Sequence, residues 1–308
     1  MEQFFKDFFQ GHKKKIIGFS FLRIFAFVQV LFWPYAFSKI VNIMSRNPED
    51  WRKALIWAGA MIFNKVLEDF IRLKAKFELE KIGTRLQISL ATFFSEKTEI
   101  REYKKTGESV QAIKKASEDI SSLIEFYKDN LLKLPVNFII IPFILYKASI
   151  DYLILLLIYG ILYLGIEYFA VNLYRKKLKK YFKASEIFWG TTYRKVPEVW
   201  RRREDGGIFA RRVNKEGKNL YQTTVSADSM NRWRWSALQS LSSASIGAVI
   251  LFVIYRIINN SAPVGDLILV AGYFKETQTT LNIITTAFSQ IIYARISLKR
   301  LDKAVKIR

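Results

Sequence analysis

Long apolar runs alternate with long charged stretches, and this alternation constrains the fold more than any other feature. The apolar runs are Ile16–Val41, Ala54–Asn64, Leu131–Ala148, Tyr152–Tyr174, Ala237–Tyr255 and Leu267–Ile292. A helix needs about 20 mostly apolar residues to cross a bilayer. The second run is clearly apolar for only part of that length, and the sixth has polar residues in its middle. We therefore expect an all-α membrane protein with six transmembrane helices, the second and sixth having the weakest apolar signal.

The distribution of Lys and Arg predicts how these spans are oriented. The net charge is +22, and the cations gather in the N-terminal segment, in the stretches 72–130 and 175–235, and in the tail. The short connections at 42–53, 147–151 and 256–266 hold few of them. Cytoplasmic segments of membrane proteins carry the excess of positive charge. Both termini and both long stretches are therefore predicted to be cytoplasmic, in a multi-pass protein of a bacterial-type plasma membrane.

The ends of the spans carry further signals. Trp33, Trp51 and Tyr146 lie near predicted outer ends, and Trp233 and Trp235 lie at an inner end, as in interfacial aromatic belts. The first apolar run is too long for a cleavable signal peptide. Phenylalanines at positions 4, 5, 8 and 9 fall on one helical face, so residues 1–14 are predicted to form an interfacial helix. A disordered start is the alternative.

The two cytoplasmic stretches are predicted to be helical hairpins, 72–130 and 175–235, that continue the flanking spans. Gly and Pro are sparse in them, and breaks are expected at Thr106-Gly107, Pro197 and Gly206-Gly207. About 28 residues of helix would reach about 40 Å from the membrane. Separately folded basic loops are the alternative. The run Arg201–Arg203 beside a bilayer favours contact with anionic lipid headgroups over nucleic acid, so no nucleic-acid partner is expected.

This arrangement resembles the membrane domain of ABC exporters, the type 1 ABC transmembrane domain. The likeness covers nearly the whole chain, 1–308, as a single domain with two long inner hairpins. Local matches are Thr106-Gly107-Glu108 in the first hairpin, Gly265-Asp266-Leu267 at the start of the sixth span, and Ser297 with Arg300-Leu301 near its end. Phe93-Phe94 lie farther from Thr106 than the family's aromatic pair does, and Tyr103 is the nearer aromatic residue.

The resemblance implies a transport mechanism and partners. In the family, hairpin tips dock on ATPase domains, whose ATP-driven closure alternates access to the substrate pathway. The implied coupling residues here are Tyr103, Thr106, Gly107, Glu108, Lys195, Glu198 and Arg201. The chain contains no phosphate loop, so ATP and Mg are expected on a partner ATPase subunit or domain. The other implied partners are a second membrane half, identical or not, and the lipid bilayer.

Polar and charged residues inside the spans are the candidates for contact with substrate, because charges in a membrane are costly and usually face a cavity or a partner. These candidates are Lys275, Glu276, Gln278, Thr279, Asn282, Glu167, Lys133, Asn137, Lys65, Glu68 and Asp69. Lys65, Glu68, Asp69 and Arg72 have helical spacing, so a self-neutralised helix face is the alternative reading there. For Lys133 the alternative is a side chain that reaches the headgroups.

Several classes of function are excluded or left as alternatives. The chain has no cysteine and a single histidine, His12, which excludes disulfides, thiolate metal sites and histidine clusters, so no cofactor is expected on this chain. No constellation of catalytic side chains stands out. Besides an exporter subunit, the sequence leaves open a non-transporting scaffold or regulatory transporter half. An ATP-independent channel also stays open, although the outer connections are short for a selectivity filter.

Overall fold

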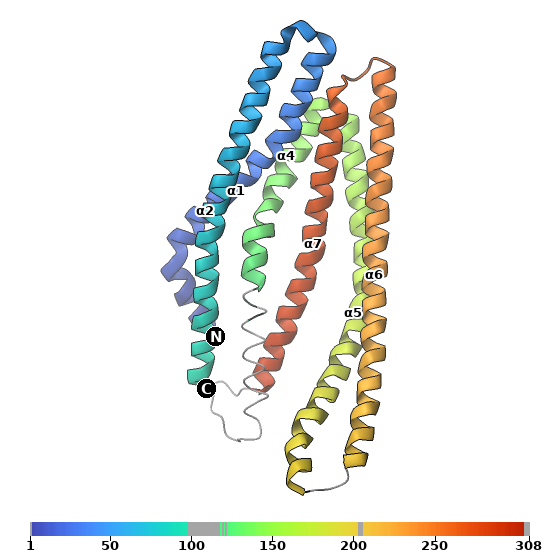
Figure 1. The fold of residues 1–308 in the computed structure, drawn as a ribbon. Coiled ribbons are helices and arrows are strands. Elements are labelled where there is room, and N and C mark those ends of the chain that lie inside the picture. Colours follow the sequence, from blue (N-terminus) through green and yellow to red (C-terminus); the bar gives the residue numbers. More distant parts are fainter. Residues whose placement is uncertain (1, 98–117, 119, 121, 203–205, 305–308) are drawn as a thin grey trace. The chain divides into compact units, whose positions relative to one another are not determined.

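The computed structural model describes residues 2–97, 118, 120, 122–202 and 206–304, and every regular element in these ranges is helical (Figure 1). The elements are α1 Glu2–Arg46, η1 Pro48–Asp50, α2 Trp51–Lys97, η3 Tyr127–Leu131, α4 Lys133–Ala148, α5 Ile150–Arg202, α6 Gly206–Ile258 and α7 Gly265–Ala304. The predicted all-α class is therefore confirmed for the described residues. The chain divides into unit 1, Met1–Leu157 with Ile246–Arg308, and unit 2, Ile158–Ser245.

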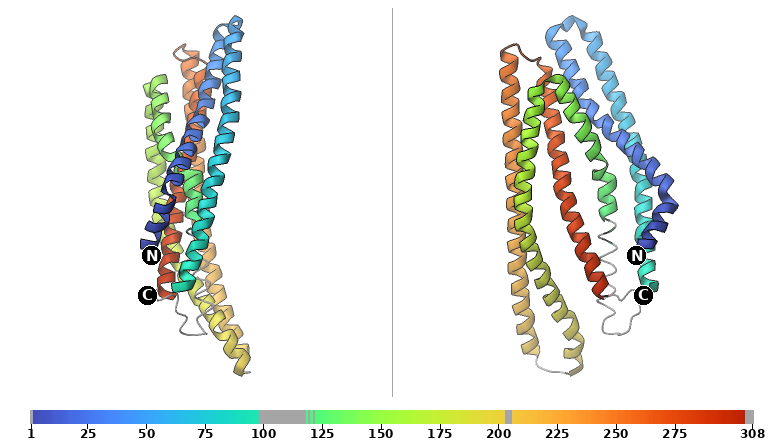
Figure 2. Two further views of the ribbon diagram at one scale, coloured as in Figure 1. Left: turned by 90° about the vertical axis from the view of Figure 1, so that its left-hand side faces the viewer. Right: turned by 180° about the vertical axis from the view of Figure 1, so that it is seen from behind.

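Unit 1 is built around α1, which packs along α2 and α7, while α4 packs against both α7 and α1. The start of α1 and the end of α7 lie at one end of this unit (Figures 1 and 2). The short connections from α1 to α2, from α4 to α5 and from α6 to α7 lie at the other end, which we call the short-connection end. Helix α1 is continuous from Glu2, so residues 2–14 form its first turns. Their location at a membrane surface stays a prediction.

The helix that leads into α4 contains an irregular turn. Residues Tyr127–Leu131 form the π-helix η3, and Leu132 N–H donates to Tyr127 O at 3.4 Å, five residues back. A π turn holds one residue more than an α turn and is frequent at functional sites. From there α4 buries Val136, Asn137, Ile141 and Leu145.

Unit 2 consists of α5 from Ile158 to its end and α6 from its start to Ser245, and the two helices are antiparallel. Helix α5 runs past Pro197 to Arg202, and α6 begins at the predicted break, Gly206. Tyr159 and Ser242 hydrogen-bond through their hydroxyl groups at 2.9 Å, and both are buried. Because α5 continues to Arg202 and α6 begins at Gly206, both helices extend well beyond their apolar parts.

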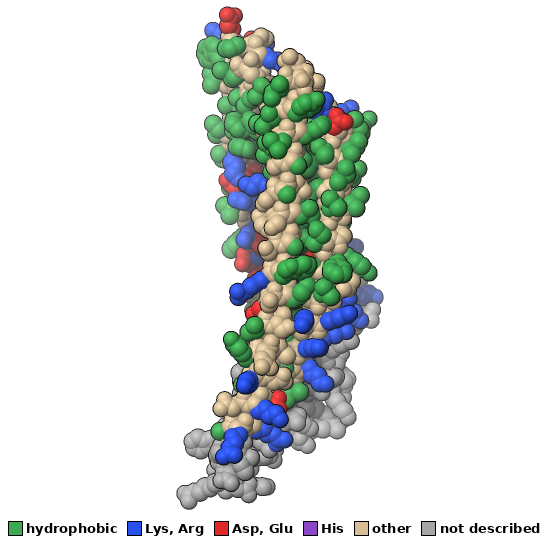
Figure 3. Space-filling view, turned by 90° about the vertical axis from the view of Figure 1, so that its right-hand side faces the viewer, with side chains coloured by type: hydrophobic (Ala, Val, Ile, Leu, Met, Phe, Trp, Pro, Cys, Tyr) green, Lys and Arg blue, Asp and Glu red, His purple; other side chains and the backbone are tan. Residues whose placement is uncertain are grey.

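Along α5, exposed apolar side chains give way to exposed cations. Large apolar side chains are exposed from Ile158 to Leu173, and exposed Lys and Arg follow from Arg175 to Lys183. On the face drawn in Figure 3, hydrophobic side chains cover the upper part, and the densest group of Lys and Arg lies below them. A change of this kind is typical of a helix that leaves the hydrocarbon core and enters the cytoplasm.

Four helices of the described part are long and apolar enough to cross a membrane. They are Gln3–Arg46, Ser122–Ala148, Ile150–Ser185 and Ala210–Ile258. These segments contain the predicted first, third, fourth and fifth spans. Helices α2 and α7, which contain the predicted second and sixth spans, do not meet this measure over their described residues. The regular elements of the described part are thus all helical, four of them are suited to cross a membrane, and the count of six spans stays a prediction.

Candidate functional site

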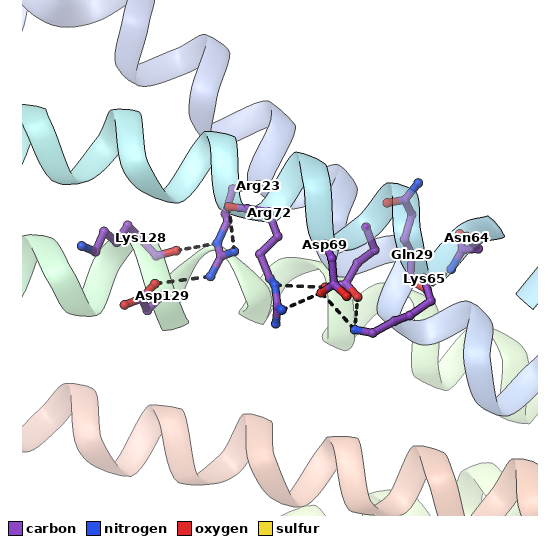
Figure 4. Close-up of polar contacts among 9 residues, drawn as sticks. Arg23, Gln29, Asn64, Lys65, Asp69, Arg72, Lys128 and Asp129 are labelled. Carbon is purple, nitrogen blue, oxygen red and sulfur yellow. Dashed lines mark hydrogen bonds and ion pairs between the residues drawn. The ribbon is translucent and has the colours of Figure 1, made fainter. Parts of the chain in front are cut away.

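The charged residues of α2 neutralise one another. Lys65 pairs with Glu68 and, at 3.2 Å, with Asp69. Arg72 pairs with Asp69 at 2.6 Å and with Glu68 at 3.3 Å. The Glu68 side chain is only 2% exposed, so the two cations offset the cost of burying its charge. The alternative reading of a self-neutralised helix face therefore describes this cluster (Figure 4).

Arg23 of α1 joins this cluster to η3, as Figure 4 shows. Its guanidinium donates to Lys128 O at 3.2 Å, to Arg72 O at 3.4 Å and to Asp129 Oδ1 at 3.3 Å. Arg23 is 5% exposed. One buried cation therefore connects α1, α2 and the π turn. It lies in the first predicted span, and it was not among the predicted site residues.

Two polar contacts link α4 to α7 farther along the same interior. Lys133 Nζ and Glu276 Oε2 form an ion pair at 2.6 Å. One turn on, Asn137 Nδ2 donates to Thr280 Oγ1 at 2.6 Å, while that hydroxyl donates to Glu276 O. Lys133 thus pairs with a carboxylate of α7, which differs from the alternative that it reaches toward headgroups. Within the described part, Asn137 Oδ1 is a buried acceptor with no hydrogen-bond donor.

We call this set of residues the polar interior of unit 1. It contains Arg23, Lys65, Glu68, Asp69, Arg72, Asp129, Lys133, Asn137, Glu276 and Thr280. The helices α1, α2, α4 and α7 and the π turn all contribute to it. Two of its ion pairs, Arg23–Asp129 and Lys133–Glu276, join different helices, whereas the pairs of α2 lie within one helix and leave Lys65 exposed. Charges that have partners are the form in which charged groups are tolerated at membrane depth.

The remaining predicted pathway residues of α7 occupy different environments. Lys275 and Thr279 are exposed, and the Thr279 hydroxyl donates to Lys275 O at 3.1 Å within the helix. Gln278 and Asn282 are half-buried. Glu276 lies in the polar interior, where it pairs with Lys133.

Glu167 lies in unit 2, where it forms a buried ion pair with Arg234. Arg234 donates to both carboxylate oxygens, from Nε to Oε2 at 2.8 Å and from Nη2 to Oε1 at 2.6 Å. The two side chains are 4% and 1% exposed. Bidentate pairing of this kind is the strong form of an Arg–carboxylate contact. The structure therefore gives Glu167 a partner on α6.

The predicted coupling residues lie largely outside the described part of the chain. Tyr103, Thr106, Gly107 and Glu108 are all outside it. Lys195, Glu198 and Arg201 lie on the backbone of α5 near its end, and their side chains are outside it as well. Their role in coupling stays a prediction.

A cavity of about 910 Å³ lies at the short-connection end of unit 1. It is lined by Val28, Leu31, Phe32, Tyr35, Ser38, Lys39, Asn42, Ile43, Arg46, Asn47, Asp50, Lys53, Ile140, Phe143, Ile144, Lys147, Ala148, Pro263, Asp266, Leu269 and Tyr273. We call it the basic cavity, because four Lys or Arg side chains and two Asp side chains line it. No sequence pattern marked it, since its walls come from four helices and two connections.

One wall of the basic cavity is fixed by a close approach of α1 and α7. A Cβ at Gly265 would lie 2.3 Å from Ser38 O, and a Cβ at Gly272 would lie 2.8 Å from Pro34 Cβ. The Gly265 N–H donates to Asn42 Oδ1 at 2.6 Å, and the Tyr273 hydroxyl donates to Leu31 O at 2.8 Å. Small residues allow the two backbones to approach, as is typical of helices packed in membranes.

We expect Gly272→Ala to lower the free energy of unfolding by about 1 kcal/mol, at the low end for an overpacked core. The added methyl group would press on the Pro34 ring, with 2.8 Å to Cβ and 3.0 Å to Cγ. The matched control is Gly59→Ala on α2, where a Cβ has nothing within 4 Å. That change should stabilise the helix by about 0.5–1 kcal/mol. Unfolding midpoints in detergent measure both, and equal stabilisation by the two changes would contradict the close packing.

Comparisons with known proteins show a fold and no family. No family model matches the chain, and no curated protein matches it. A solved structure of a bacterial Atm1-family ABC exporter with ATP bound has a TM-score of 0.80 and 13% sequence identity to it. The match covers 96% of this chain and 54% of that one, so the chain spans about half the length of the exporter. At this identity the likeness concerns the fold, which is that of an ABC exporter-like membrane protein.

Proposed function

We propose that this chain is the membrane-spanning half of an ATP-driven exporter and provides a substrate pathway by alternating access. The observation that carries the proposal is the likeness to an ABC exporter over 96% of the chain. In this proposal, ATP and Mg bind to an ATPase subunit or domain and not to the 308 residues described by this sequence. The proposal also requires a second membrane half, and the polar interior of unit 1 would face the pathway between the halves.

The proposal requires α2 to cross the membrane, and its exposed face supports this. Large apolar side chains recur there at intervals of seven, three, four, three and four residues: Ile56, Phe63, Val66, Phe70, Leu73 and Phe77. At 1.5 Å per residue this stripe is about 32 Å long. The hydrocarbon core of a bilayer is about 30 Å thick. The four charges from Lys65 to Arg72 are paired among themselves, and Lys74 is exposed near the end of the stripe. The apolar face that precedes Lys74 can therefore lie against lipid.

The sixth span would be α7, which turns some of its polar residues toward neighbouring helices and leaves Lys275 and Thr279 exposed. Tyr273, Phe274 and Thr280 are buried, and Glu276 pairs with Lys133 of α4. Partnered polar groups are the form in which polar residues are tolerated at membrane depth. With α2 and α7 counted, six spans place both termini on one side, as the excess of Lys and Arg there predicts.

Ion pairs between helices suit a transporter that alternates between two states. The pairs Lys133–Glu276 and Arg23–Asp129 each join different helices through a single contact. Such pairs can be exchanged when packed helices slide or rotate. We infer that the polar interior contacts substrate in one state and closes on itself in the other. The hairpin tips, with Glu108 and Glu198, would transmit the movement of the ATPase.

A reconstitution experiment tests the proposal. The tagged chain is purified from native membranes after cross-linking, bound proteins are identified by mass spectrometry, and the complex is reconstituted in liposomes. We expect an ATP-binding protein with a phosphate loop, and ATP hydrolysis that the membrane chain stimulates. Glu108→Ala and Glu198→Ala should lower that stimulation, whereas Glu49→Ala in η1, at the short-connection end, should not.

Three results would separate the proposal from its rivals. Absence of any ATP-binding partner, with no stimulated hydrolysis, would count heavily against an exporter subunit. Flux through liposomes that contain the chain alone would support an ATP-independent channel instead. A stable complex that hydrolyses ATP but moves no solute, with the Glu276→Gln variant behaving as the parent, would indicate a regulatory scaffold.

A further inference from the structure

The geometry points to a ligand for the basic cavity: we propose that it binds an amphipathic anion, a molecule with an apolar body and one anionic headgroup. The binding claim rests on unit 1 alone. The further inference that such an anion is the class of molecule exported rests on the proposed function. The shared chemistry is an alkyl or acyl chain that carries a phosphate, sulfate or carboxylate.

The inner part of the cavity is suited to an apolar body. Its walls there are formed by side chains such as Leu31, Phe32, Ile140, Ile144 and Leu269. The volume of about 910 Å³ lies within the roughly 300–1,000 Å³ of small-molecule sites. The close contact of α1 with α7 holds one wall in place, so little ordering would be required on binding.

The charged groups of the cavity favour an anion. Lys39, Arg46 and Lys147 line it, and in the described part of the chain none of the three forms an ion pair. Asp50 pairs with Lys53 at 2.9 Å. Asp266 accepts from the Tyr152 hydroxyl at 3.2 Å and interacts electrostatically with Lys39 and Arg46, although neither cation lies within ion-pair distance of it. A headgroup that carries negative charge would therefore meet three cations that have no carboxylate within ion-pair distance.

Helix ends account for only part of this charge. Arg46 and Lys147 lie in the last turns of α1 and α4, where cations are favoured by the helix dipole. Lys39 lies about two turns before the end of α1, beyond the reach of that effect. The short connections also contain few cations. Three of these cations line this cavity: Arg46, Lys53 and Lys147. Their convergence from three helices on one hollow supports a binding site.

Equilibrium binding of a fluorescent dodecyl phosphate to the full chain in phosphatidylcholine nanodiscs tests the proposal, with empty discs subtracted. We expect saturable binding and none for dodecyltrimethylammonium of the same chain length. A triple variant should raise the Kd of dodecyl phosphate at least about tenfold, because it loses charge-assisted contacts. This variant combines Lys39→Gln, Arg46→Gln and Lys147→Gln. Ile144→Gln should also weaken binding. The matched control Arg52→Gln removes an exposed cation at the same end that does not line the cavity.

The outcomes decide the site and its natural occupant. Unchanged affinity in the triple variant, or equal binding of the cationic amphiphile, would overturn the proposal. Lys39→Gln alone keeps the test valid if the triple variant misfolds. Competition by phosphatidylglycerol in the disc supports a membrane lipid as the source, and probe binding that survives it supports a free amphiphile. If the probe binds and no ATPase partner is found, the proposed binding site is supported and the proposed exporter function is contradicted. If ATP hydrolysis is stimulated and the probe does not bind, the exporter function is supported and the proposed binding site is contradicted.

Discussion

Glu167→Gln is expected to lower the free energy of unfolding by about 3–5 kcal/mol, the cost of leaving a buried charge without its partner. Glutamine keeps the shape of the side chain and removes the charge that Arg234 contacts through two nitrogens, at 2.8 and 2.6 Å. Both side chains are almost fully buried, so water cannot replace the lost carboxylate. The effect should appear as a large drop in the unfolding midpoint of the purified chain in detergent.

Two further variants isolate the pair as the cause. Glu167→Met combined with Arg234→Met removes both charges, and replacement of a buried pair by apolar groups is often neutral or stabilising. The double variant should therefore recover most of the loss. Arg232→Gln removes an exposed cation two residues away and serves as the control. If Glu167→Gln shifts the midpoint no more than Arg232→Gln does, the buried pair contributes little.

Lys133→Met is expected to cost about 3 kcal/mol, the low end for breaking a buried ion pair, because both partners retain some exposure. The Lys133 and Glu276 side chains are 13% and 23% exposed, and their charged atoms lie 2.6 Å apart. Without the lysine, Glu276 keeps its negative charge in the polar interior with no cation at that distance. Denaturant unfolding in detergent measures the loss, and Lys275→Met, an exposed cation on the same helix as Glu276, is the control.

Exchanging the charges of Lys133 and Glu276 distinguishes a role in helix packing from a role in contact with substrate. Lys133→Glu with Glu276→Lys restores an ion pair between α4 and α7, so the lost stability should return. Export by the reconstituted complex then separates the roles. Recovery of export would assign the pair to helix packing, and persistent loss with restored stability would assign it to the pathway. A double variant as unstable as Lys133→Met would contradict the pairing.

Hydropathy was sufficient to identify the helices that lie in the most apolar stretches. Ile16–Val41 and Tyr152–Tyr174 were the surest spans by sequence, and both lie in helices that are long and apolar enough to cross a membrane. The second span looked short because Lys65, Glu68, Asp69 and Arg72 interrupt it. Only the structure shows that these charges pair along one face while an apolar stripe continues on another. An average over a window cannot separate the two faces of a helix.

Outside the charged cluster of α2, the partners of the polar residues could not be predicted, because they are far apart in the chain. Asn137 meets Thr280, and Glu167 meets Arg234, across 143 and 67 residues. Arg234 lies at the end of the predicted cytoplasmic stretch 175–235, between two tryptophans, and nothing in the sequence marks it as a buried cation. Arg23 is a different case. It is a lone charge within an apolar run, and the cost of burying it would have identified it from the sequence alone.

The π turn at Tyr127–Leu131 makes this region sensitive to length rather than to composition. It contains one residue more than the α turn that it replaces. Removal of one residue would leave helix, charge and hydropathy almost unchanged, yet would rotate everything before it by about 100° relative to α4. Asp129 would turn away from Arg23, while Lys133 and Asn137 kept their places. A lineage that carries this chain should therefore tolerate substitutions here more readily than a single deletion.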